Sequence, residues 1–262
     1  MIILKKTLFK IIIIILFLFL ISIVFKNEFV NLFNNISNSF TRTLILENRY
    51  ILILSGLKAT MIISILSILF GTILGTILCF ISRSKIKTLS KIVKIIIKLL
   101  QGIPITVMLL IFYYVIFGTI NINPMIVAVI TFSIYFSAYI SEVLKGAFDS
   151  INYSQIEAAY SLGFSKFQTL KYIILPQALS YIIPTYKNEV VSLIKLTSIS
   201  GYISIMDLTK ASDIIRNRTY EAFFPLIITA IIYLIICYLI GFILDKLYKK
   251  INPRYYYKRS NI

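Results

Sequence analysis

The chain has 262 residues, of which 59% are hydrophobic, and its mean hydropathy of +0.91 predicts an integral membrane protein. Its 27 Lys and Arg exceed its 10 Asp and Glu, but these basic residues gather between apolar runs and at both termini, which is the positive-inside pattern and not a nucleic-acid-binding face. The absence of His excludes histidine acid–base chemistry and histidine metal sites. The two cysteines, Cys79 and Cys237, lie inside apolar runs, as expected of packing residues.

Residues 1–49 are expected to form an N-terminal membrane helix and a short outer segment. Lysines precede an apolar run over residues 11–25, and Lys26 closes it. Such a run is typical either of a signal peptide or of a first membrane helix with snorkelling lysines. We expect the helix, because no Ala-x-Ala-like cleavage site follows and cleavage would leave only residues 27–48 before the next span.

The next apolar run, residues 50–81, predicts a second span that carries several small residues. Gly71 and Gly75 form a GxxxG pair, which lets two helices approach closely in lipid, either inside the chain or with a partner. The sequence around them, GTILGT, lacks the lysine of a phosphate-binding loop. No nucleotide site is therefore expected, and any ATP hydrolysis should belong to another subunit.

A basic amphipathic segment follows the second span. Its lysines recur at helical spacing on one face, with isoleucines and a leucine on the other, which predicts a helix on the cytoplasmic membrane surface. The lysines are Lys87, Lys91, Lys94 and Lys98, and the apolar residues are Ile92, Ile95, Ile96 and Leu99. Gly102 and Pro104 then bend the chain into a third span ending near residue 120, and a fourth span is expected over residues 125–139.

Residues 154–178 predict a helix, a tight glycine corner and a second helix. Ser154 and Glu157 have the capping-box spacing that starts a helix. Gly163 stands where a helix commonly ends in a left-handed residue, a conformation that glycine adopts at little cost. The first helix is therefore expected to begin at Ser154 and to end at Gly163.

Ser165 and Gln168 repeat the capping-box spacing at the start of the second helix, which Pro176 is expected to end. A fifth, less hydrophobic span should follow Pro184, and a last span should cover residues 224–244. The fold class is thus all-α: a polytopic membrane protein of about six transmembrane helices, with the hairpin and both termini in the cytoplasm.

The hairpin carries a pattern with a known family resemblance. Glu157, Ala158 and Ala159, then Gly163, and then Pro176 keep the spacing of the EAA motif. The chain therefore resembles the membrane-spanning permease subunits of ABC importers.

Further stretches resemble the polar amino-acid branch of these permeases, beginning at Gly56, Ser137 and Ile194. The resemblance covers residues 50–248 and leaves outside it the N-terminal helix and a basic cytoplasmic tail, residues 249–262. The chain departs from the family at two places. Gln101, Gly102, Ile103 and Pro104 stand where Arg-Gly-Thr-Pro is usual, and Leu196 replaces an acidic or amide residue.

The resemblance implies an architecture and a set of partners. A core of five helices would pair with a second permease copy or a sister subunit around a central pathway. Two cytoplasmic ATPases would bind the hairpins, residues 154–176, and an extracellular substrate-binding protein would deliver a small solute, expected to be a polar amino acid. The location implied is the plasma membrane of a prokaryote, and no cofactor is expected.

The resemblance assigns the coupling to the ATPase to Glu157, Ala158, Ala159, Gly163, Ser165 and Pro176. The candidate pathway residues are Glu142, Lys195, Thr197 and Ser198. They are polar side chains within or near expected spans, and an amino acid needs an acceptor for its ammonium group and donors for its carboxylate. The alternatives are an interfacial Glu142 paired with Lys145 and a structural ion pair of Lys195.

Two other functions remain open from the sequence. One is a permease for another small solute. The other is a membrane scaffold or sensor that uses the hairpin only to hold a partner and has no transport pathway. The polar residues of the fifth span favour transport.

Overall fold

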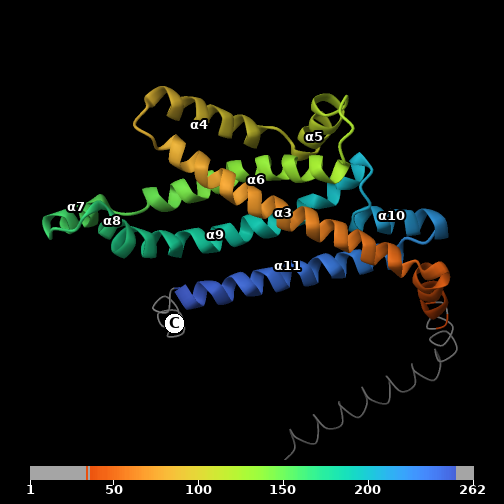
Figure 1. Cartoon of the computed structure of the whole chain (residues 1–262). Helices are drawn as coiled ribbons and strands as arrows, with labels where there is room; N and C mark the ends of the chain where they lie inside the picture. The colour runs from red at the N-terminus through yellow and green to blue at the C-terminus, as the bar shows by residue number, and fades with distance from the viewer. Residues whose placement is uncertain (1–33, 35, 252–262) are drawn as a thin grey trace, which may run out of the picture.

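The computed structural model describes residue 34 and residues 36–251, and all regular elements in this part of the chain are helical (Figure 1). The four long helices are α3 (Tyr50–Ser82), α6 (Pro124–Asp149), α9 (Leu175–Leu196) and α11 (Phe223–Ile251). Helices α3, α6 and α11 run in one direction and α9 runs in the other (Figure 1). The expected all-α class is confirmed, whereas the expected N-terminal helix and nearly all of the basic tail fall outside the described residues.

Helix α3 packs along α6 through glycines that bring the two backbones close together. A Cβ atom on Gly71 would lie 2.9 Å from the carbonyl oxygen of Ser133, and one on Gly75 would lie 2.8 Å from the Cβ of Ile140. The GxxxG pair therefore packs inside the chain. The largest fully buried side chains of the core around this contact are Ile63, Leu109, Phe132, Phe136, Ile140, Leu193, Ile194 and Ile203.

The expected surface helix and third span form one bent segment. Helix α4 (Lys87–Gly102) meets α5 (Ile105–Leu110) and the π-helical turn η3 (Ile111–Ile116) at 102°. The break falls at Ile103, whose backbone is extended because Pro104 follows it.

The expectation of a complete span after Pro104 is wrong. Helix α5 and η3 together are about 18 Å long at 1.5 Å per residue, which is too short for a hydrocarbon core of about 30 Å. Helix α4 is also more than a surface helix, because Val93 and Ile97 pack on Ala138 of α6. The two pieces together make a broken span or a re-entrant segment.

Two expected boundaries are also corrected. Helix α6 continues ten residues past Tyr139, to Asp149. Helix α9 starts at Leu175 and contains Pro184, so the fifth span does not begin after that proline. A proline removes one backbone donor, a loss that long membrane helices tolerate when neighbouring groups compensate.

The outer end of the bundle is closed by a short helical layer. The 3₁₀ helix η5 (Thr197–Ile203) continues α9 and turns into α10 (Leu208–Thr219). Short helical turns over Thr41–Ile45 and Leu46–Asn48 precede α3 at the same end.

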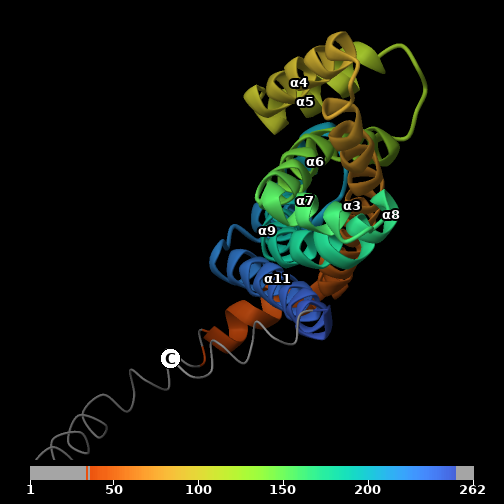
Figure 2. The same ribbon diagram turned by 90° about the vertical axis from the view of Figure 1, so that its left-hand side faces the viewer.

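Three helices, α3, α6 and α11, are long and apolar enough to cross a membrane, and each bent pair can add one more span. The pairs are α4 with α5–η3, and the segment Lys166–Ile203 with α10. Up to five spans in the described residues are consistent with the five-helix core. The hairpin of α7 (Tyr153–Ser161) and α8 (Lys166–Thr169) projects past the end at which α3, α6 and α11 finish, and Figure 2 shows this end of the bundle face on.

Candidate functional site

The first arm of the hairpin starts earlier than expected. Asn152 is the N-cap of α7, and its side-chain oxygen accepts a hydrogen bond from the backbone N–H of Ser154 at 3.0 Å. The expected Ser154–Glu157 capping box is therefore wrong, since Asn is an equally good cap and places Ser154 inside the helix. The Glu157 side chain is left exposed on the surface of the hairpin.

The corner is built as expected. Gly163 has φ of +81°, and its N–H donates to the carbonyl of Tyr160 at 3.0 Å. The N–H of Phe164 donates to the carbonyl of Ala159, also at 3.0 Å, which completes a Schellman motif. A Cβ atom on Gly163 would have nothing within 4 Å, so the space beside this corner is open for a partner.

The second arm has the predicted start but not the predicted end. The capping box of Ser165 and Gln168 is confirmed by both of its hydrogen bonds. The backbone N–H of Gln168 donates to the Ser165 hydroxyl at 3.2 Å, and the backbone N–H of Ser165 donates to the side-chain carbonyl oxygen of Gln168 at 2.8 Å. Pro176, however, lies in the first turn of α9 and does not end the helix. The π-helical turn η4 (Leu170–Ile174) shifts the hydrogen bonding just before Pro176, where its missing N–H would otherwise break the helix.

The base of the hairpin is fixed to the bundle. The Gln177 side chain donates to the side-chain oxygen of Gln155 at 2.7 Å, which joins α9 to α7. Ala178 is fully buried and packs in one cluster with Ala147 and Ile151 at the end of α6. The second arm continues through η4 into the membrane helix α9 without a break in the helical path.

The hairpin exposes large apolar side chains although it lies beyond the spans. Leu162 is 77% exposed and Phe167 is 70% exposed. The hairpin surface, as we name it, consists of Tyr153, Tyr160, Leu162, Phe164, Phe167 and Tyr172, all of them exposed. Exposed apolar side chains of this kind are typical of surfaces that bind other proteins.

The candidate pathway residues are not gathered in one place within a chain. Glu142 on α6 and Lys195 on α9 are both exposed, and neither forms an ion pair with another described residue. Phe136 and Tyr186 set the register of the two antiparallel helices, with ring centroids 6.2 Å apart. From that level Glu142 lies about 9 Å toward the hairpin and Lys195 about 14 Å toward the outer end, at about 1.5 Å per residue.

Thr197 and Ser198 have different surroundings. Thr197 is fully buried, where its hydroxyl donates to the carbonyl of Ile194 at 2.7 Å and lies 3.4 Å from the Ser64 hydroxyl of α3. Ser198 instead lines a small polar cavity of about 150 Å³ at the outer end, together with Lys210 and Asp213. Thr197 thus holds η5 against α3, whereas Ser198 faces accessible space.

Glu189 is a polar candidate that the sequence analysis did not select. It is half-buried in the middle of α9 and interacts electrostatically with the hydroxyl of Tyr135, which donates a 3.1 Å hydrogen bond to Tyr139. A carboxylate at membrane depth usually marks a function, so the presence of an acidic residue inside the expected fifth span is the signal that could have found it.

Asp207 is the second residue that the sequence analysis missed. It is fully buried and caps α10, because its carboxylate accepts hydrogen bonds from the Lys210 N–H at 2.6 Å and the Ser200 hydroxyl at 2.9 Å. An aspartate directly before a helical segment is a sequence signal for an N-cap. Asp207 holds the outer layer together and does not face a pathway.

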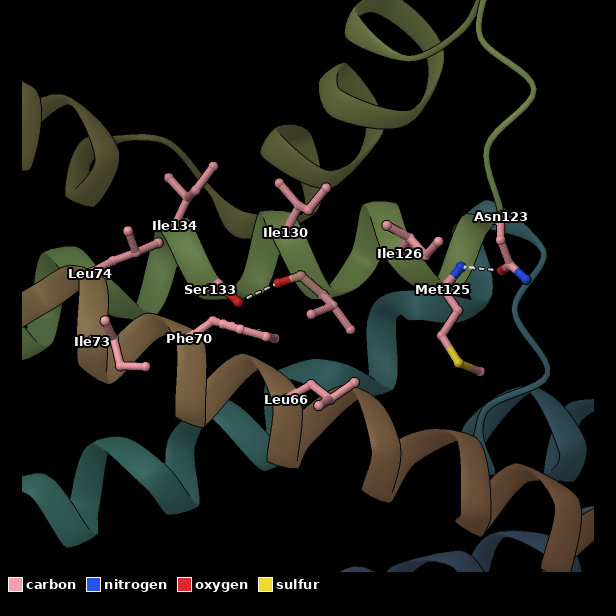
Figure 3. A pocket seen from close by; sticks show the side chains of 11 residues that line it. Leu66, Phe70, Ile73, Leu74, Asn123, Met125, Ile126, Ile130, Ser133 and Ile134 are labelled. Carbon is pink, nitrogen blue, oxygen red and sulfur yellow. Dashed lines mark hydrogen bonds between the residues drawn. The ribbon is translucent and has the colours of Figure 1, made fainter.

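A large groove between α3 and α6 is apolar (Figure 3). Its volume is about 640 Å³, and side chains such as Leu66, Phe70 and Ile130 line it. Its polar side chains are already bonded, since Asn123 caps α6 through the Met125 N–H and Ser133 donates to the Val129 carbonyl. No charged side chain lines the groove, so it offers no ionic partner to the charged groups of an amino acid.

A membrane-spanning helical bundle with a rigid hairpin projecting from the end where its basic segments gather is the architecture of an ABC-importer permease. Residues 67–255 match the family described as binding-protein-dependent transport system inner membrane component, and the chain belongs to this family. It is therefore the permease subunit of an ABC importer, a multi-pass plasma-membrane protein that works with a separate ATPase subunit and a substrate-binding protein.

Similar proteins include the glutamine transport system permease protein GlnP of Escherichia coli, 31% identical over 204 residues, which cover 77% of this chain and 93% of that protein. The L-cystine transport system permease protein TcyB of Bacillus subtilis is 34% identical over 191 residues, 72% of this chain and 81% of TcyB. A crystal structure of an amino acid ABC transporter with histidines has a TM-score of 0.69 and 31% identity, and the match covers 76% of this chain and 94% of that one.

Proposed function

We propose that this permease carries a polar amino acid and is driven by an ATPase that binds the hairpin surface. The observation that carries the coupling role is the rigid, capped hairpin, which presents exposed apolar side chains beyond the bundle and continues directly into α9. The relatives named for glutamine and L-cystine support an amino acid as the solute and make these two compounds the first to test.

The proposed coupling residues are Glu157, Ala158, Ala159, Gly163, Ser165 and Pro176. Glu157 and Ala158 are exposed on α7 and can contact the ATPase, whereas the buried Ala159 supplies the carbonyl that closes the corner. Gly163 leaves open space beside its left-handed backbone, and Ser165 fixes the start of the second arm. Pro176 lies where this arm enters α9 and transmits its movement.

The proposed pathway residues act at different depths. Lys195 and Ser198 lie in the outer half, where they can donate to the substrate carboxylate, with Thr197 holding this segment in position. Glu189 is the acceptor nearest to them along α9, and Glu142 lies farther toward the cytoplasm. One amino acid cannot contact Glu142 and Lys195 of the same chain, so we assign them to successive stages of passage. A second permease copy or a sister subunit would complete the pathway.

The coupling proposal is tested by uptake into proteoliposomes that contain the permease, its ATPase and its binding protein. Gly163→Asp is expected to insert normally and to abolish uptake while ATP hydrolysis continues. The matched control is Gly146→Asp near the cytoplasmic end of α6, where a Cβ atom also has nothing within 4 Å. Normal uptake by Gly163→Asp, or equal loss in the control, would contradict the coupling role.

The pathway proposal is tested with Lys195→Met and Glu142→Gln in the same assay. Lys195→Met is expected to raise the substrate concentration needed for half-maximal uptake, and Glu142→Gln to lower the maximal rate. Lys58→Met is a suitable control, because Lys58 is also exposed and lies in the outer part of a spanning helix, α3. Unchanged kinetics in both variants would exclude the pathway role, and absence of any ATP-dependent uptake would favour a scaffold or sensor.

A further inference from the structure

Helix α4 forms one wall of a cationic groove that the transport function leaves unexplained. The α4 groove has a volume of about 390 Å³ and is lined by Lys87, Lys91, Lys94 and Lys98 together with Ser84 and Ser90. Its lining comes from the turn before α4 and from α4 itself. Helix α4 begins at the end of the bundle from which the hairpin projects (Figure 1).

The positive charge of the α4 groove is not compensated by any ion pair within residues 36–251. None of its four lysines forms an ion pair with a described residue. The adjacent Arg83, by contrast, is paired with Asp149 and lies over the ring of Phe148. Like charges three and four residues apart destabilise a helix, so a bound anion would stabilise α4.

Uncharged donors face the same space. The Ser84 hydroxyl oxygen is buried and has no hydrogen-bond partner among the described residues, although Ser84 lines the groove. Ile86, the N-cap of α4, provides no side-chain cap, so the positive end of the helix dipole lies beside Ser84 and Lys87 of the groove. A phosphate group is bound by positive charges and hydrogen-bond donors. The groove supplies both, through its lysines, the Ser84 hydroxyl and the uncapped start of α4.

The other face of α4 indicates where that phosphate comes from. Ile92, Ile96 and Leu99 are exposed and apolar, and they lie beside the lysine face on the same helix. A free phosphate would satisfy only the lysines. A phospholipid satisfies both faces, because its acyl chains cover the isoleucines while its headgroup reaches the groove.

We propose that the α4 groove binds the headgroup phosphate of an anionic phospholipid in the cytoplasmic leaflet. The site does not depend on which solute the permease carries. Because α4 packs on α6 through Val93, Ile97 and Ala138, a bound lipid stabilises the contact between α4 and α6.

The test uses the full-length permease, purified in a neutral detergent both in complex with its ATPase and without it. Short-chain phosphatidylglycerol and phosphatidylcholine are titrated separately, and bound lipids are counted by native mass spectrometry. The groove variant is Lys91→Gln with Lys94→Gln. The control is Lys246→Gln with Lys250→Gln, which removes the same charge from the cytoplasmic end of α11.

We expect saturable binding of phosphatidylglycerol in preference to phosphatidylcholine, weakened roughly ten-fold or more in the groove variant and unchanged in the control. Binding should also weaken as salt is raised. Equal binding of the two lipids, equal loss in the control, displacement by millimolar inorganic phosphate, or binding seen only without the ATPase would each overturn the proposal. The last two outcomes would assign the groove to free phosphate or to an acidic ATPase surface.

Discussion

Gly75 of α3 lies directly against Ile140 of α6, so that a Cβ atom on Gly75 would be 2.8 Å from the Cβ of Ile140. This contact, with that of Gly71 on Ser133, sets the distance between two helices that cross the membrane in the same direction. Gly75→Leu is therefore expected to destabilise the fold by about 1–3 kcal/mol, because neither backbone can move aside without disturbing the core. The measurement is thermal unfolding in detergent.

Gly241→Leu is the matched control for that substitution. Gly241 lies in α11, and a Cβ atom there would have nothing within 4 Å. The unfolding temperature of the Gly241→Leu variant should stay near that of the wild type. If the two variants melted at the same temperature, close packing of α3 on α6 would not be the reason for the glycine at position 75.

Asp207→Ala is expected to lower the free energy of unfolding by about 2–4 kcal/mol. The substitution removes the N-cap of α10 and leaves the Ser200 hydroxyl and the Lys210 N–H without their acceptor in a buried site. Asp207→Asn should be much milder, since an amide oxygen also caps a helix. Asp213→Ala serves as the comparison and should cost less than about 1 kcal/mol, because the pair that Asp213 forms with Arg216 is partly exposed. An Asp207→Ala protein as stable as Asp213→Ala would contradict this role.

The two possible caps of α7 can be separated by substitution. Asn152→Ala should speed amide hydrogen exchange in α7 roughly five-fold, because loss of an N-cap costs about 1 kcal/mol. Ser154→Ala should leave that exchange unchanged, since the Ser154 side chain does not cap the helix. Hydrogen exchange followed by mass spectrometry reports both variants, and the opposite ranking would restore the Ser154 cap.

Lys187 in the middle of α9 pairs with Asp245 near the cytoplasmic end of α11, with a nitrogen–oxygen distance of 2.7 Å. In a double-mutant cycle of Lys187→Met and Asp245→Asn we expect a coupling of about 0.5 kcal/mol, small because the Asp245 side chain is half-exposed. The coupling should shrink when the salt concentration is raised to about 1 M. A coupling that is independent of salt would mean that packing, and not charge, joins the two helices.

Several local features follow from neighbouring residues alone, and they were predicted correctly. The Gly163 corner and the Ser165–Gln168 capping box depend on residues within one turn, so spacing in the sequence is enough to find them. Predictions that depended on competition between signals failed. Asn152 displaced Ser154 as the cap, and a π-helical turn allowed the helix to continue through Pro176.

The sequence by itself determined the all-α class, the membrane location and the hairpin, because apolar length, charge asymmetry and capping residues are local quantities. Tertiary structure alone decided that α4 and α5 form a bent pair, that the GxxxG glycines pack inside the chain, and that Glu142 and Lys195 lie far apart along the bundle. The physical reason is the same in each case. Which faces of two helices meet, and at what register, depends on side chains distant in sequence, and no periodicity within one helix contains that information.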